Sequence, residues 1–160
     1  MEYIIDGYNL IRSTYLSKAE KHSTEFARNS LTEILTKYKR KHPSINFTVV
    51  FDGQFSSADS KRQKIKVFFS GDITADELIQ KILERKKTTN EIIVVSDDRE
   101  IQTGTKILGG HISKTAEFLE KISPALKHYK QEKEQVNKNL DYKSISTIEK
   151  ELKKHYGVRS

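Results

Sequence analysis

Short runs of β-branched and aromatic residues, almost uninterrupted by polar ones, constrain the fold of this chain more than any other feature. Three runs stand out, and a fourth and a shorter fifth resemble them: residues 3–5, 47–51, 92–95, 65–69 and 111–113. Strands that are apolar throughout, rather than at alternate positions, are typical of parallel sheets covered on both faces. We therefore expect a mostly parallel sheet.

Between these runs, apolar residues recur at the spacing of amphipathic helices. Such helices are predicted for Thr24–Lys41, Thr74–Lys86 and Ser113–Ile122. Because strands and helices alternate along the chain, the predicted class is α/β, with a three-layer α/β/α arrangement around the sheet.

The last part of the chain differs in composition from the rest. We place a domain boundary at Pro124, which gives a compact domain over residues 1–123 and an extension over 124–160. The extension holds nine Lys or Arg against five Asp or Glu. Its residues 144–155 again show helical spacing, whereas residues 128–143 fit either a solvated helix or a linker. We expect a basic, mostly helical tail.

Composition narrows the range of functions. The formal net charge is +7, which favours a polyanionic partner such as nucleic acid. The chain has no cysteine, so thiolate chemistry and disulfides are excluded, and a cytoplasmic location is the natural expectation. No apolar run approaches the length of a membrane span. Glycine-rich nucleotide motifs and the serine-hydrolase motif are absent as well, so no organic cofactor is expected.

Aspartates follow three of the predicted strands directly. Asp6 follows the first, Asp52 the second, and Asp97 comes after residues 92–95 and Ser96. In an open parallel sheet, ligands bind outside the carboxyl ends of the strands, where these carboxylates can converge. Clustered carboxylates repel one another, and their hard oxygens suit Mg²⁺ or Mn²⁺. The alternative for each Asp is an ordinary turn former or helix cap.

Asp76 is a fourth candidate ligand. Thr74 and Glu77 form the T-x-x-E pattern of a capping box, which gives Glu77 a sufficient structural role. Helical geometry turns Glu77 away from the apolar stripe and leaves Asp76 at its edge, where it can face the sheet. A carboxylate at an apolar margin is costly unless it is paired or bound to a metal. The helix dipole offers Asp76 a purely structural alternative.

Other polar residues near these positions have less specific signals. Asn9 is a candidate ligand or orienting donor, or else a turn cap. Asp98 fits the cap of a short helix. The loop that follows Asp52 carries positive charges, which fit either a solvated loop or contacts with a phosphate backbone; the candidates are Lys61, Arg62, Lys64 and Lys66.

Four short motifs resemble those of a known family. Residues 3–11 contain a D-G-x-N pattern, and residues 49–53, 74–77 and 95–98 are similar to the second, third and fourth motifs of the NYN domains. NYN domains are a branch of the PIN-like nucleases. The order and spacing look like the YacP-like bacterial branch, over roughly residues 1–122.

The resemblance implies a PIN-like fold and endonuclease activity on single-stranded RNA with Mg²⁺ or Mn²⁺. It further implies mRNA decay, since some relatives act on mRNA at the ribosome, which makes the ribosome a candidate partner. The metal ligands carried over are Asp6, Asp52, Asp76 and Asp97, of which Asp6, Asp76 and Asp97 would be catalytic and Asn9 and Ser96 supporting. Many PIN domains have acids two apart in the fourth motif, whereas Asp97 and Asp98 are adjacent, which leaves the role of Asp98 open.

Our hypothesis is metal-assisted hydrolysis of phosphodiester bonds, in which the metal activates water and offsets phosphate charge. One rival is an RNA- or ribosome-binding module on a degenerate nuclease fold. A second is a phosphotransfer protein, either receiver-like with Asp52 as the acceptor or haloacid-dehalogenase-like. Against the receiver type, Asp6-Gly7 lacks the expected paired acids, and only Lys114 is in its favour. Against the dehalogenase type, Tyr8 stands where a D-x-D motif needs an acid.

Overall fold

The computed structural model describes residues 1–55, 64–86 and 88–156. Its centre is a five-stranded sheet in the order β3-β2-β1-β4-β5, and every pair of neighbouring strands is parallel. The expected parallel α/β class is confirmed. The strands are β1 (Glu2–Asp6), β2 (Asn46–Phe51), β3 (Lys66–Phe69), β4 (Ile92–Val95) and β5 (His111–Ser113).

Strand β1 is the middle of the sheet and fixes where the strand ends meet. Its residue Ile5 lies opposite Val49 of β2 and Val95 of β4. Because all five strands run the same way, their carboxyl ends lie along a single edge. We call it the carboxyl edge, and the opposite side the amino edge.

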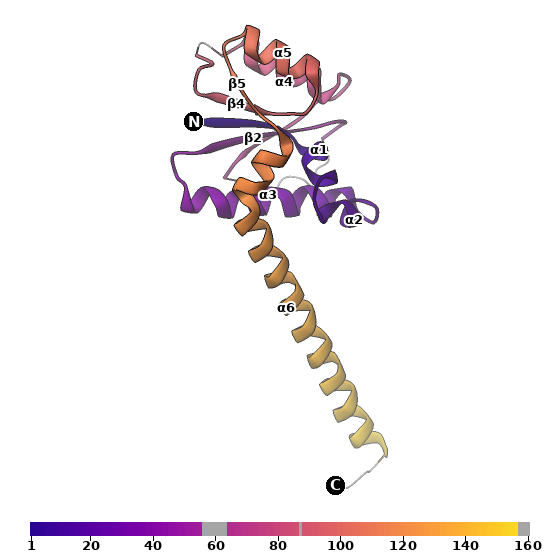
Figure 1. The fold of residues 1–160 in the computed structure, drawn as a ribbon. Coiled ribbons are helices and arrows are strands. Elements are labelled where there is room, and N and C mark those ends of the chain that lie inside the picture. Colours follow the sequence, from indigo (N-terminus) through magenta and orange to yellow (C-terminus); the bar gives the residue numbers. More distant parts are fainter. Residues whose placement is uncertain (56–63, 87, 157–160) are drawn as a thin grey trace. The chain divides into compact units, whose positions relative to one another are not determined.

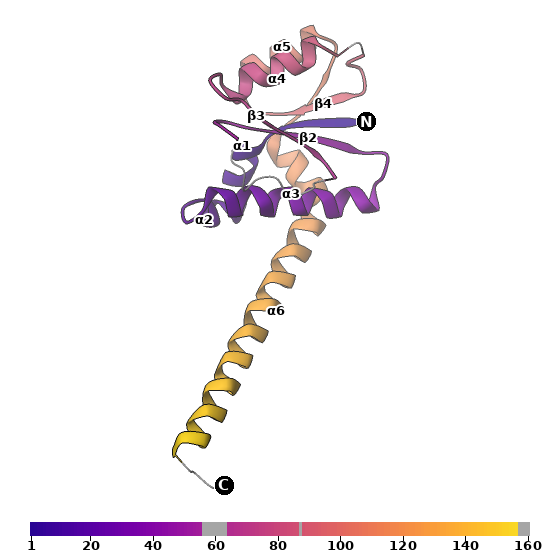
Figure 2. The ribbon, with the colours of Figure 1, turned by 180° about the vertical axis from the view of Figure 1, so that it is seen from behind.

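Helices cover both faces of this sheet, as Figures 1 and 2 show from opposite sides. Helix α3 (Thr24–Lys41) lies along one face with the short helices α1 (Gly7–Arg12) and α2 (Leu16–Glu20). Helices α4 (Ala75–Glu84) and α5 (Arg99–Ile107) cover the other face. The three-layer α/β/α arrangement is therefore confirmed.

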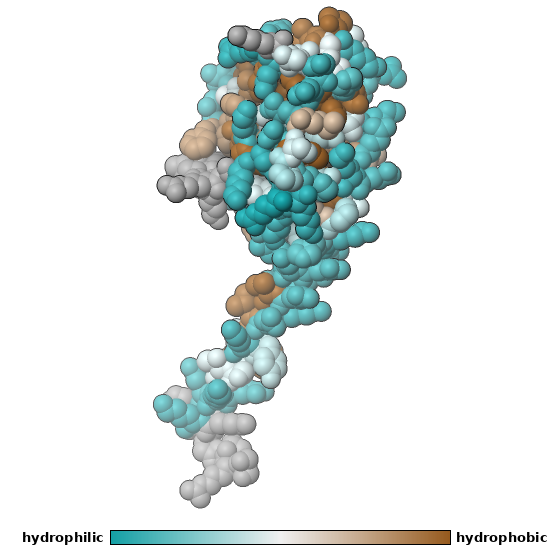
Figure 3. Space-filling view, turned by 90° about the vertical axis from the view of Figure 1, so that its left-hand side faces the viewer, coloured by the Kyte–Doolittle hydropathy of each residue, from teal (hydrophilic) through white to brown (hydrophobic). Residues whose placement is uncertain are grey.

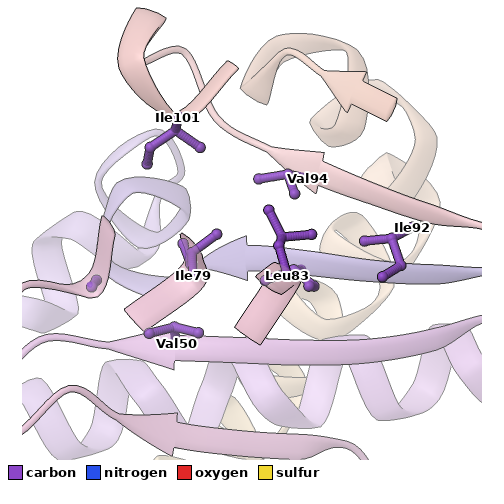
Figure 4. Close-up of a cluster of buried hydrophobic side chains, with 8 residues drawn as sticks. Val50, Ile79, Leu83, Ile92, Val94 and Ile101 are labelled. Carbon is purple, nitrogen blue, oxygen red and sulfur yellow. The ribbon is translucent and has the colours of Figure 1, made fainter. Parts of the chain in front are cut away.

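The two faces of the sheet have different cores. Beneath α4 and α5 the core is aliphatic, and Figure 4 shows Ile79 and Leu83 of α4 meeting side chains of β2 and β4. Beneath α3 aliphatic side chains are joined by aromatic ones, since the Phe47 ring contacts those of Tyr3, Tyr38 and Phe118. Successive side chains of a strand point to opposite faces of the sheet, so a strand that is apolar at every position contributes to both cores.

Helix α6 differs from its prediction. It was expected to span Ser113–Ile122, but it runs from Thr115 to Tyr156 with Pro124 inside it. Proline removes one backbone hydrogen bond and crowds the preceding turn. Pro124 is exposed, however, and good helix formers such as Ala125 and Leu126 follow it, so the helix continues. Residues 128–143, for which a linker was one alternative, are helical.

The chain divides into two compact units, residues 1–125 and 126–160. The described part of the second unit is a helix with a polar surface that exposed apolar side chains interrupt. Figure 3 shows a group of apolar side chains on this helix. The exposed apolar residues are Val136, Leu140, Tyr142, Ile145, Ile148 and Leu152. In the part of the chain that the structure describes, no helix is both long and apolar enough to cross a membrane.

Candidate active site

Asp6 is the last residue of the central strand and the cap of the helix that follows. Its Oδ1 accepts a hydrogen bond from the backbone N–H of Asn9 at 3.1 Å, and only 8% of the residue is exposed. Gly7 is required next to it, because a Cβ at this position would overlap the buried ring of Phe51. The D-G pair thus lets helix α1 begin directly at the carboxyl edge and holds the Asp6 carboxylate there.

Asp52 connects the end of β2 to helix α4. Its Oδ1 accepts a hydrogen bond from the backbone N–H of Ala75, the first residue of α4, at 2.7 Å. The loop after β2 is also bound to the loop after β3. Gly53 N–H donates to the Ser70 hydroxyl, and the Gln54 amide donates to Asp72. Asp52 is therefore both exposed and held in position at the carboxyl edge.

The two adjacent aspartates after β4 have different partners. Asp98 caps α5, and its Oδ1 accepts hydrogen bonds from the backbone N–H groups of Glu100 and Ile101. The suggestion that Asp98 caps a short helix is thus confirmed. Asp97 accepts from the backbone N–H of Thr115, the first residue of α6, at 3.1 Å. Buried Ser96 shapes this turn, because its hydroxyl accepts from the Asp98 N–H.

The Asp76 carboxylate differs from those of Asp6, Asp52, Asp97 and Asp98, which each accept a backbone hydrogen bond at the start of a helix. The capping box predicted for Thr74 and Glu77 is present, with both of its hydrogen bonds formed. Asp76, one residue before Glu77, has no hydrogen bond or ion pair among the residues that the structure describes. Burial raises its pKa, and four nearby carboxylates raise it further: those of Asp6, Asp98, Asp52 and Glu100.

Asp6, like Asp76, is affected by the charge of a neighbouring carboxylate. Burial raises the pKa of Asp6, and the charge of Asp52 adds to this effect. The hydrogen bond from Asn9 and the positive charge of Arg12 act in the opposite direction. Four side chains predicted for the site (Asp6, Asp52, Asp76 and Asp98) thus influence one another through their charges. Glu100, which the sequence reasoning missed, belongs with them.

The donor set fits a hard divalent cation in its chemistry. Among residues 1–55, 64–86 and 88–156, no three His, Asp or Glu side chains lie close enough together to enclose an ion. Mg²⁺ seldom needs such a cage, because it keeps several waters and is usually held by one or two carboxylates together with substrate phosphates. Asp76 and Asp6 could provide carboxylates of this kind, because their charges act on each other.

Of the predicted RNA-binding residues that the structure describes, Lys66 lies away from this edge. Lys66 begins β3 at the amino edge, where its ammonium lies 4.0 Å from the Glu2 carboxylate. Lys64 is exposed just before it. Lys61 and Arg62 lie outside the described residues.

Two arginines that the sequence reasoning missed act on Asp6 or on Tyr8, which follows it by two residues. Arg12 of α1 acts on the charge of Asp6. Arg28 of α3 donates to the hydroxyl of Tyr8, two residues after Asp6, at 2.8 Å. The spacing of Arg12 from Asp6, just over one and a half helical turns, was a usable signal only once α1 was known.

A five-stranded parallel sheet with helices on both faces and carboxylates gathered at its carboxyl edge defines a PIN-like nuclease fold. The family model of the YacP-like NYN domain matches residues 3–157. The chain therefore belongs to the YacP-like NYN family, and this membership points to a nuclease-like, RNA-related function.

Solved structures agree with this fold. The crystal structure of Rae1 (YacP) from Bacillus subtilis has 22% sequence identity and a TM-score of 0.63, over 98% of this chain and 92% of that one. A W164L mutant of the same protein gives 22% identity and a TM-score of 0.64, over 86% and 83%. At this identity the likeness concerns the fold. No curated protein matches the sequence closely enough to count as a relative.

Proposed function

We propose that this protein is an endoribonuclease that hydrolyses phosphodiester bonds in single-stranded RNA with the help of Mg²⁺ or Mn²⁺. The observation that carries the proposal is the state of Asp76. Its carboxylate lacks a partner among the described residues and stands among four other carboxylates. A carboxylate in such surroundings is costly unless a cation offsets the repulsion.

The aspartates at the carboxyl edge would have different roles in this reaction. Asp76 and Asp6 would hold the cation, and Asp52, Asp97 and Asp98 would add negative charge around it while fixing the starts of α4, α6 and α5. When bound, the metal lowers the pKa of a water and offsets charge on the phosphate. Asn9 is exposed, and its side-chain amide would orient a phosphate or a water beside Asp6.

Our proposal for the substrate and its cellular context is based on the family. Membership in the YacP-like branch supports an RNA substrate, and mRNA reached at the ribosome in the cytoplasm is the context that we propose for it. The net charge of +7 supports a polyanionic partner. Contacts made by lysine and arginine to a phosphate backbone provide affinity and little base specificity. We therefore expect cleavage of unstructured RNA with weak sequence preference.

A test compares the wild type with Asp76→Asn and Asp6→Asn on single-stranded RNA in Mn²⁺, with and without EDTA. Both variants are expected to lose at least a hundredfold in cleavage rate while they remain folded, because each loses charge that the cation requires. Glu77→Gln is the matched control, since it removes the neighbouring carboxylate on the same helical turn and should retain activity. Cleavage that persists in EDTA or in Asp6→Asn would refute the proposal.

A second candidate, an RNA-binding module without catalysis, is favoured by one observation. The carboxylates of Asp52, Asp97 and Asp98 are each engaged with backbone N–H groups at helix starts. These are sufficient structural roles. The same assay separates the two candidates, because a binding module would retain RNA without cleaving it under any metal condition.

A further inference from the structure

Four aromatic rings form a row beside the acids on the α3 face of the sheet. The row begins at Tyr8, whose ring lies 5.1 Å from Phe51, and Phe51 lies 5.8 Å from Phe69. It ends at Phe55, which meets Phe69 nearly at a right angle, with ring centroids 5.7 Å apart. We call these four residues the aromatic row.

Two arginines accompany the aromatic row. The Arg28 guanidinium lies 5.5 Å from the Phe69 ring and 6.0 Å from the Phe51 ring, and it donates to the Tyr8 hydroxyl. The Arg12 guanidinium lies 5.4 Å from the Tyr8 ring. Aromatic rings alternating with arginines are the chemistry that binds single-stranded nucleic acid, where bases stack and phosphates meet positive charge.

Both ends of the row lie close in the sequence to aspartates of the candidate active site. Tyr8 follows Asp6 by two residues, and Phe55 follows Asp52 by three. The loop that carries Phe55 is held to the loop after β3 by the hydrogen bonds of Gly53 and Gln54 described above. A base on the row would therefore belong to a nucleotide close to the phosphate at the acids.

Burial within the row is uneven, and this distinguishes core packing from a binding surface. Phe51 is fully buried, and its ring belongs to the core. Phe55 exposes 60% of its surface although it contacts Phe69, so packing alone does not account for a phenylalanine there. An apolar protein partner would not need the two arginines, whereas a base attached to a charged backbone uses both features.

We propose that Phe55, backed by Phe69, is the stacking subsite for one nucleobase of single-stranded RNA next to the scissile phosphate, with Arg12 and Arg28 beside the backbone of the same strand. The inference rests on the proposed function for the position of the phosphate. The contact is to the face of a base, so the subsite accepts any of the four bases.

The chain offers a close control. Phe68 is also an exposed phenylalanine, with 43% of its surface accessible, but it precedes Phe69 on β3 and so faces the opposite side of the sheet. Phe55→Ala and Phe68→Ala therefore remove the same side chain from the two faces. Phe55→Trp retains a ring for stacking and tests rescue.

The first measurement is affinity for a short fluorescent single-stranded RNA, made in the Asp76→Asn background so that no cleavage takes place. Phe55→Ala is expected to bind about tenfold more weakly, which corresponds to about 1.4 kcal/mol and lies within the range for one base on one aromatic ring. Phe68→Ala should bind like its parent, and Phe55→Trp should restore affinity. Unchanged binding in Phe55→Ala, or an equal loss in Phe68→Ala, overturns the inference.

The second measurement replaces single nucleotides of that RNA by abasic ones. Removing the base at one position should weaken the binding of the RNA to the parent protein. The same removal should not weaken binding to Phe55→Ala any further, because the missing base and the missing ring belong to one contact. Additive losses at every position overturn the inference. Coupling without any cleavage by the metal-loaded wild type would support the subsite and refute the nuclease. Cleavage without coupling would do the reverse.

Discussion

Replacing Asp76 by Asn is expected to stabilise the metal-free protein against unfolding. Asn keeps the shape of the side chain and removes only its charge. At neutral pH the charge of Asp76 faces those of Asp6, Asp98, Asp52 and Glu100. The substitution therefore relieves repulsion and breaks no hydrogen bond among the described residues.

The size of the effect follows from two opposing contributions. A like-charge pair at partly exposed positions costs about 0.2–0.5 kcal/mol, so four such pairs cost on the order of 1–2 kcal/mol. Against this, the first turn of α4 favours a negative charge by about 0.3–1 kcal/mol through the helix dipole. Repulsion wins, and the net gain is about 1 kcal/mol, which raises Tm by about 3 °C in a protein of this size.

The dependence on pH has a definite sign. Burial, followed by the neighbouring carboxylates, raises the pKa of Asp76 above its ordinary value of 3.8 in the folded protein. The folded state then holds this proton more tightly than the unfolded chain does, so the free energy of unfolding falls as pH rises from 3.8 through the folded pKa. The advantage of Asp76→Asn should be absent below this interval and complete above it.

Urea unfolding of the wild type and Asp76→Asn, in EDTA at several pH values, measures this difference. Glu77→Gln is the control: its amide oxygen can still complete the capping box, but it loses a negative charge in the first turn of α4, so it should be less stable by about 0.5 kcal/mol. Added Mg²⁺ should reverse the order, because it stabilises the wild type by binding the folded state and has a weaker site in Asp76→Asn. A metal-free Asp76→Asn that is less stable than the wild type at neutral pH would refute the reasoning.

Three further substitutions test the local structure by urea unfolding. Gly7→Ala should lower the free energy of unfolding by about 1–3 kcal/mol, because its Cβ would overlap Phe51; a wild-type value would mean that the ring moves aside freely. Thr74→Ala should cost about 1 kcal/mol by removing the N-cap of α4, and no loss would show that the cap contributes nothing. Thr105→Val should be stabilising by about 1 kcal/mol, because the buried Thr105 hydroxyl has no hydrogen-bond partner among the described residues. A clear loss would indicate that this hydroxyl has a partner, such as a water.

Much of the fold was predictable because the strongest signals were long and periodic. The range predicted for α3 is the observed one, and its apolar stripe from Ala27 to Tyr38 is buried. Helices α1 and α2 were missed, since helices of six and five residues are too short to show a period. The end of α6 was misjudged because a proline weakens a helix without always ending it.

The positions of the candidate site residues were predictable where one strand or one helix determines them. Asp6 ends β1 and Asp52 follows β2, so a parallel sheet brings them to one edge. The charges that act on Asp76 include that of Asp98, whereas the carboxylate of its neighbour Asp97 binds the start of α6. Sequence cannot separate adjacent residues of this kind, because a small backbone rotation decides which one turns toward the cluster.

The aromatic row and its arginines could not be predicted from the sequence for a different reason. Its members come from helix α1, helix α3, the ends of two strands and the loop after β2, with no common spacing in the sequence. A contact between Arg28 and Tyr8, twenty residues apart, exists only once α3 has packed on the sheet.

The hydrogen bonds from strand-end aspartates to helix starts have a consequence for anyone who redesigns this protein. A carboxylate has two oxygens, and Asp52 and Asp97 each use Oδ1 to accept a backbone N–H from a helix far along the chain. Alanine at either position would remove a charge and release a helix at the same time, so lost activity could not be attributed to either cause. Asparagine, whose amide oxygen still accepts the N–H, separates electrostatics from architecture.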